Sequence, residues 1–127
     1  MSKAFLLALA VTCASTAAIA APAPTVETGY ARGSLAVAAI ERADWARAEQ
    51  LLTDRHLNAD DPARLINLGQ VYWATGRQGE ALSAWRRALV SNNHFIVETI
   101  GGRQVSTEQL AGEALASHQG AERSAAR

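Results

Sequence analysis

The chain has 127 residues, enough for one domain, and 49% of them are hydrophobic. Twelve basic side chains balance twelve acidic ones, so no net charge draws the protein toward nucleic acid or acidic lipid. Aromatic residues are few, and alanine supplies much of the apolar content, a composition typical of helices that pack closely together.

Residues 1–20 have the pattern of a secretory signal peptide. Lys3 precedes an uncharged apolar stretch, and Ala18-Ile19-Ala20 forms a typical cleavage site. We therefore expect cleavage after Ala20 and a periplasmic or secreted protein; an uncleaved segment that anchors the chain in a membrane is the alternative. Cys13, the one cysteine, would leave with this peptide, so we expect no disulfide in the processed chain. Residues 21–28 contain two prolines and are predicted to be a flexible leader.

Residues 29–61 predict a pair of helices separated by a polar break. The first pattern starts at Gly29, and its apolar residues follow one helix face: Leu35, Ala36, Ala39 and Ile40. Asp44 is a suitable N-cap for the second helix, whose apolar residues are Trp45, Ala48, Leu51 and Leu52.

Residues 62–95 predict a second pair of helices. Asp61 followed by Pro62 is a clear helix start, because an acidic N-cap precedes a proline whose missing N–H costs nothing there. Gly76 is expected to end the third helix. The fourth helix carries a further apolar face: Ala81, Leu82, Trp85, Ala88 and Leu89.

The second pair of helices repeats the first at one constant offset along the chain. This offset aligns four pairs of apolar or small residues: Leu35 with Leu68, Ala36 with Gly69, Ala48 with Ala81, and Leu52 with Trp85. Repetition at this period is typical of helical solenoids, in which each hairpin buries one face against its neighbours. The fold class that we predict is therefore all-α, a short α-solenoid of two helix-turn-helix repeats.

The second copy resembles a tetratricopeptide repeat. The resemblance lies in a Leu-Gly pair followed by a tyrosine, then a glycine turn, then a small–aromatic–small pattern: Leu65, Leu68, Gly69, Tyr72, Gly76, Ala81, Trp85 and Ala88. The first copy is degenerate, with Ala39 in place of the tyrosine and Arg55 in place of Ala88. The resemblance implies a module that binds a peptide or partner domain and catalyses nothing.

Residues 96–117 predict a β-hairpin and a capping helix. The β-branched run that ends at Ile100 is followed by Gly101-Gly102 and a second extended run, a pattern typical of a hairpin with a primed turn. Continuation of the preceding helix is the alternative for the first run. Ser106-Thr107-Glu108-Gln109 is a capping box that opens the last helix. Residues 118–127 are polar and are predicted to be a disordered tail.

The sequence offers no set of residues for catalysis, for a metal or for another cofactor. His56, His94 and His118 are scattered, and no cysteine is expected to remain with them. A pocket that gathered His94, Glu98 and an arginine would favour a small periplasmic enzyme, the remotest alternative. Arg77, Arg86 and Arg87 form a basic patch that we interpret as a solvated helix face.

In the family that this chain resembles, the first helix of each repeat lines a concave groove. The residues that fall on that face by helical spacing are Tyr30, Ser34 and Val37 in the first copy and Ile66, Asn67, Gln70 and Trp73 in the second. The amides of Asn67 and Gln70 could hydrogen-bond a peptide backbone, and Trp73 could anchor a side chain. A groove filled by the C-terminal segment, with Trp73 in the core, is the alternative. The predicted function is an exported protein-interaction adaptor; the alternative is a self-associating structural subunit.

Overall fold

The computed structural model describes residues 30–125 of the chain. It contains, in chain order, α1 (Val37–Glu41), α2 (Trp45–Leu52), α3 (Pro62–Ala74), α4 (Gln78–Leu89), β1 (Ile96–Glu98), β2 (Gln104–Ser106) and α5 (Thr107–Ala125). The chain is thus mostly helical with one small antiparallel sheet. The predicted signal peptide, its cleavage site and the predicted leader lie outside the described residues. Within the described residues, no helix is both long and apolar enough to cross a membrane.

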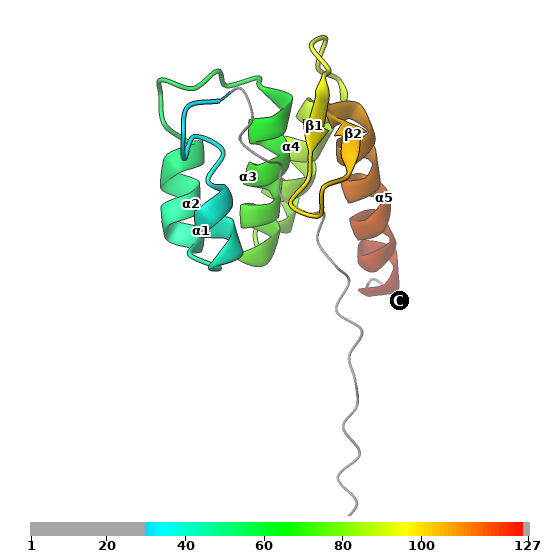
Figure 1. Cartoon of the computed structure of the whole chain (residues 1–127). Helices are drawn as coiled ribbons and strands as arrows, with labels where there is room; N and C mark the ends of the chain where they lie inside the picture. The colour runs from blue at the N-terminus through cyan, green and yellow to red at the C-terminus, as the bar shows by residue number, and fades with distance from the viewer. Residues whose placement is uncertain (1–29, 126–127) are drawn as a thin grey trace, which may run out of the picture.

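The helices lie side by side, and α3 occupies the centre (Figure 1). The pair α1 and α2 packs on one side of α3, whereas α4, the hairpin and α5 lie on the other (Figure 1). Helix α3 is buried without interruption from Pro62 to Val71. A helix that is covered on all faces belongs to the interior of a fold, so α3 is the element around which the others assemble.

The predicted caps of α2 and α3 are confirmed. The carboxylate of Asp44 accepts a hydrogen bond from the backbone N–H of Arg47 at 3.2 Å, and Asp61 accepts one from Arg64 at 3.0 Å. Both aspartates therefore satisfy an N–H that the first turn of the helix would leave unpaired. Pro62 stands at the first position of α3, as the sequence predicts.

The first predicted helix is much shorter than the sequence indicates. We expected a helical segment from Gly29, but the described residues before Val37 form turns, and α1 extends only from Val37 to Glu41. Gly33 has φ 85° and Ala36 has φ 56°, so both lie in the left-handed region and interrupt the helix. Leu35 and Ala36 are both buried, as the sequence predicts, but they lie in turns rather than in a helix.

The two helix pairs turn in the same way at equivalent positions. Between α1 and α2, Ala43 has φ 55° and the N–H of Asp44 donates to the carbonyl of Ala39 at 2.9 Å. Between α3 and α4, Gly76 has φ 80° and the N–H of Arg77 donates to the carbonyl of Tyr72 at 2.8 Å. Both turns are Schellman-type helix ends, and the offset of the sequence repeat aligns Ala43 with Gly76.

The predicted hairpin is confirmed, and its turn differs from the prediction. Strands β1 and β2 pair antiparallel, with Val97 opposite Val105 on the buried face. The N–H of Gly102 donates to the carbonyl of Thr99 at 2.8 Å, and Gly102 alone among the turn residues has a positive φ, 79°. This is a longer loop closed by a left-handed glycine rather than a two-residue primed turn.

The last helix also departs from the prediction. Helix α5 continues to Ala125, so the prediction of a disordered tail from residue 118 is wrong for residues 118–125. The reason is His118, which continues the apolar face of the helix and is only 1% exposed. A buried ring one turn beyond Ala114 anchors the helix where the composition of the segment alone suggests fraying.

Candidate functional site

Three residues of the predicted concave face share one apolar cluster. Ile66 belongs to it, and the half-buried Tyr30 and Val37 pack against it. The same cluster contains four residues of the hairpin and α5: Val97, Val105, Leu110 and Ala111. The hairpin and α5 therefore cover part of the face that the sequence predicted to be concave.

Three predicted binding residues on α3 have no exposed surface to offer. Ile66 and Asn67 are 0% exposed, and Gln70 is 4% exposed. The Nδ2 of Asn67 donates to the carbonyl of Leu35 at 2.9 Å, so this amide ties α3 to the turn before α1. The burial of these residues agrees with the alternative in which the groove is filled. They stabilise the core, because a buried amide must find its partners within the fold.

Trp73 belongs to a cluster of three rings that joins α3, α4 and α5. Its ring centroid lies 6.0 Å from that of Trp85 and 4.2 Å from that of His118, in an edge-on arrangement with the histidine. Trp73 is half-buried, whereas Trp85 is fully buried and donates from Nε1 to the carbonyl of Ile66 at 3.1 Å. The position of Trp73 matches the alternative in which this tryptophan is part of the core.

His118 closes this cluster from the side of α5. Its Nδ1 lies 2.7 Å from the carbonyl of Ala114, and its Nε2 is buried without a hydrogen-bond partner among the described residues. The ring centroid of His118 lies 4.8 Å from that of Trp85. The packing of His118 against the two tryptophans was not predicted from the sequence, although a helical spacing of four residues places His118 and Ala114 on one face.

The first-copy residues of the predicted face are partly buried. The hydroxyl of Tyr30 donates to both carboxylate oxygens of Asp61, at 2.9 and 3.1 Å, beside the N-terminus of α3. Burial, followed by this hydrogen bond and the charge of Asp61, raises the pKa of Tyr30 well above its ordinary value. The hydroxyl of Ser34 is buried without a partner among the described residues, and Val37 is half-buried. None of the three forms an exposed contact surface.

The structure does not gather an acid–base pair around His94 and Glu98. The ring nitrogens of His94 lie 3.1 Å from the hydroxyl of Thr107 and 3.1 Å from the carbonyl of Leu89, which hold the ring against the start of α5. Glu98 is exposed and accepts a hydrogen bond from Gln104 at 3.0 Å. Residues 30–125 contain no group of three potential metal ligands.

The basic patch predicted around α4 is largely neutralised. Arg77 lies 2.7 Å from Glu49 and also pairs with Glu80, while Arg87 lies 2.7 Å from Asp60. These pairs link α4 to α2 and to the connector before α3. They are consistent with the interpretation of a solvated helix face, because exposed ion pairs satisfy both charges locally.

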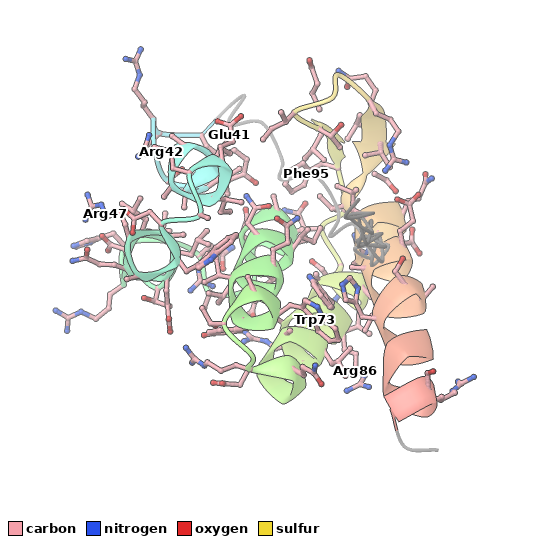
Figure 2. The ribbon with its side chains drawn as sticks, turned by 90° about the horizontal axis from the view of Figure 1, so that it is seen from below. Glu41, Arg42, Arg47, Trp73, Arg86 and Phe95 are labelled. Carbon is pink, nitrogen blue, oxygen red and sulfur yellow. The ribbon has the colours of Figure 1, made fainter. Side chains whose placement is uncertain are left out.

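Another group of arginines lies at the opposite end, where sequence analysis identified no site. Arg32, Arg42 and Arg47 line a groove over α1 and α2. Figure 2 shows Arg42 and Arg47 at this end, away from Trp73, Arg86 and α5. The spacings between the three arginines fit neither a helix nor a strand period, so no pattern in the sequence places them together. The turns before α1 and between α1 and α2 bring them to one surface.

Comparisons with known proteins found no matching family model, no matching curated protein and no matching solved structure.

Proposed function

We propose that this protein is an exported, non-catalytic helical-repeat module of the tetratricopeptide type that binds another protein. In this proposal α1–α2 and α3–α4 are the two repeats of a short solenoid, and α5 is its cap. The proposed location is the periplasm or the exterior of the cell, after cleavage behind Ala20. The partner is a protein rather than nucleic acid, because the formal charge of the chain is balanced.

The observation that carries this proposal is the equivalence of the two helix turns. The left-handed residue and the hydrogen bond that closes the turn recur at the offset of the sequence repeat. The small residues Ala48 and Ala81, which the same offset aligns, are both 0% exposed where the second helix of each pair packs on the first. Agreement in sequence, backbone conformation and burial at one period is expected of a repeated unit.

The partner would bind to the outer helix faces. The residues that would line the inner face, by the resemblance to tetratricopeptide repeats, are buried or half-buried here, partly against the hairpin and α5. A rigid stack of helices still offers side chains at fixed positions on its outer surface, and such preorganisation lowers the entropy cost of binding. The protein is therefore still an adaptor, but its partner binds the outer helix faces rather than the inner face that the sequence predicted.

The test uses the full chain with a C-terminal affinity tag, expressed in its own source. We expect the protein to be recovered from an exported fraction with an intact mass corresponding to residues 21–127, and to retain a specific protein through mild washing. The control is Trp85→Ala, which removes the largest fully buried side chain and should unfold the module. A protein retained equally by this variant does not depend on the fold. Retention of no fold-dependent protein, or a purely intracellular location, would contradict the proposal.

Self-association is a second candidate because three large apolar side chains are exposed on the described surface. Val90 is 74% exposed, Ile96 63% and Ile100 42%. Two of them belong to the hairpin, whose strands also have unpaired outer edges. Light scattering of the processed chain and of Ile96→Ser separates the two candidates. A dimer that is lost in Ile96→Ser favours the structural subunit, whereas a monomer in both favours the adaptor.

A further inference from the structure

A groove with a buried apolar floor and a rim of arginines lies over α1 and α2. It has a volume of about 350 Å³, and Ala36, Ala39 and Leu51 are among the residues that line its floor. Ala36 is 1% exposed and Ala39 3% exposed, so both belong to the core beneath the groove. The apolar surface that a ligand could contact comes from Ala38, which is exposed, and Leu51, which is half-buried. Helices α1 and α2, which contribute its lining, lie on the side of the molecule away from α5 (Figure 1).

All the charged side chains that line this groove are arginines: Arg32, Arg42 and Arg47. Within the described residues none of them makes an ion pair, in contrast to Arg77, Arg87 and Arg103 elsewhere on the surface. Arg47 donates to the side-chain oxygen of Gln50 at 2.8 Å, which orients its guanidinium without neutralising it.

Two acidic residues neighbour these arginines, and neither lines the groove. The carboxylate of Asp44 accepts the backbone N–H of Arg47 and caps α2, and Glu41 is exposed next to Arg42 in the chain. Figure 2 shows Glu41 apart from Arg47 on this end of the molecule. The charges that line the groove itself are therefore all positive, in a protein whose total formal charge is zero.

We propose that this groove binds an acidic peptide segment of the partner protein, with one apolar side chain against Ala38 and Leu51 and flanking carboxylates on the arginines. Guanidinium groups match this chemistry because their planar donors bind carboxylates in pairs. An apolar floor favours a peptide over nucleic acid, since none of the residues that line the groove is an aromatic on which a base could stack. The leader of this chain is a poor occupant because residues 21–28 contain one carboxylate, that of Glu27.

This inference rests on the proposed function and can fail separately from it. The probe is a fluorescein-labelled peptide of repeated Glu-Leu-Glu-Glu units with acetyl and amide ends, so that binding reports side-chain carboxylates and not a chain terminus. Its matched control has glutamine in place of every glutamate. We expect the processed chain to bind the glutamate peptide, and we expect the affinity to fall steeply at about 0.5 M salt, because salt screens exposed charges.

The decisive comparison is between two double variants that change the total charge equally. Arg42→Glu/Arg47→Glu reverses the groove, and Arg86→Glu/Arg123→Glu reverses two exposed arginines on α4 and α5. We expect the first to weaken peptide binding by about tenfold or more and the second to have little effect. Arg42→Gln/Arg47→Gln provides a milder version should charge reversal disturb α1 or α2, and circular dichroism checks the fold of each variant.

Several results would overturn the inference. These are equal binding by the two charge-reversal variants, equal binding of the glutamate and glutamine peptides, and displacement of the probe by duplex DNA at lower concentration than by unlabelled peptide. Binding seen only after residues 21–28 are deleted would assign the groove to the leader. A dimer lost in Arg42→Glu/Arg47→Glu but unaffected by peptide would assign it to a second copy. Fold-dependent capture of a partner by both double variants would overturn the groove assignment and leave the proposed function intact.

Discussion

Replacement of Gly69 by alanine is the sharpest test of how α3 packs on α4. A Cβ added to Gly69 would lie 2.6 Å from Cδ1 of Trp85, well inside van der Waals contact. Trp85 is 0% exposed, and the rings of Trp73 and His118 lie against it. The indole therefore has no free space into which it could move, and the strain must fall on the helix pair.

Two terms of opposite sign determine the size of the effect. Replacing a glycine inside a helix by alanine stabilises by about 1 kcal/mol, because the unfolded chain loses freedom. Overpacking a filled core costs about 1–3 kcal/mol. Since the new methyl group meets a rigid indole, we take the upper value and expect Gly69→Ala to lower the free energy of unfolding by about 2 kcal/mol. Urea unfolding followed by circular dichroism and tryptophan fluorescence measures it.

The matched control is Gly120→Ala on α5, where an added Cβ meets nothing within 4 Å. We expect this variant to gain up to about 1 kcal/mol. Trp85→Leu completes a double-mutant cycle, because removal of the indole frees the space that the alanine needs; the coupling should favour the double variant by about 1–3 kcal/mol. If Gly69→Ala is as stable as Gly120→Ala, or the coupling is zero, the close approach of Gly69 to Trp85 is refuted.

Three further predictions address a turn, an ionisable group and the end of α5. Ala43→Gly should stabilise by about 1 kcal/mol and Gly76→Ala should destabilise by a similar amount in urea unfolding, because both positions are left-handed; equal effects of the same sign would contradict this. The pKa of Tyr30 is raised in the folded state by burial and by Asp61, so above about pH 10 the unfolded chain loses a proton that the folded chain keeps. Stability should therefore fall as pH rises from there, and less so in Tyr30→Phe; parallel pH profiles of the two proteins would oppose it. Deletion of residues 118–127 should lower the free energy of unfolding by about 3 kcal/mol, since it removes the buried ring of His118; an unchanged unfolding midpoint would support a dispensable tail.

The elements that the sequence predicted well are those with local signals. Asp44 and the Asp61-Pro62 pair mark the starts of α2 and α3 through contacts within one turn. Gly76 ends α3, and Gly101-Gly102 locates the hairpin loop. Such signals act over a few residues, so they can be identified before any tertiary contact is known.

The misjudged elements depend on distant contacts. Ala36 adopts a left-handed conformation that alanine does not prefer, and it is held there in a buried cluster with α2 and α3. His118 extends α5 because two tryptophans from other helices surround its ring. A polar residue in a polar segment carries no sign of this role, so composition predicted a tail.

The exposure of the predicted binding residues on α3 also depends on a distant part of the chain. Helical spacing grouped Ile66, Asn67 and Gln70 on one face of α3, but all three are buried, as is every residue of α3 from Pro62 to Val71. Spacing cannot say whether a face meets solvent or a later part of the chain. Because the hairpin and α5 supply the cover, the amides satisfy the interior instead of a ligand.

Substitutions at the two ends of the helix stack should change different properties of the protein, because the hairpin and α5 pack on only one of them. Burial of Trp73, Trp85 and His118 ties the C-terminal helix to α3 and α4, so substitutions there alter stability. The arginines over α1 and α2 lie on the far side of the stack from this cluster (Figure 2). Arg42 and Arg47 are exposed and make no ion pair within the described residues. Charge reversal there should therefore leave the unfolding midpoint nearly unchanged while it weakens binding of the acidic peptide by about tenfold or more. Gly69→Ala should do the reverse at temperatures where it remains folded.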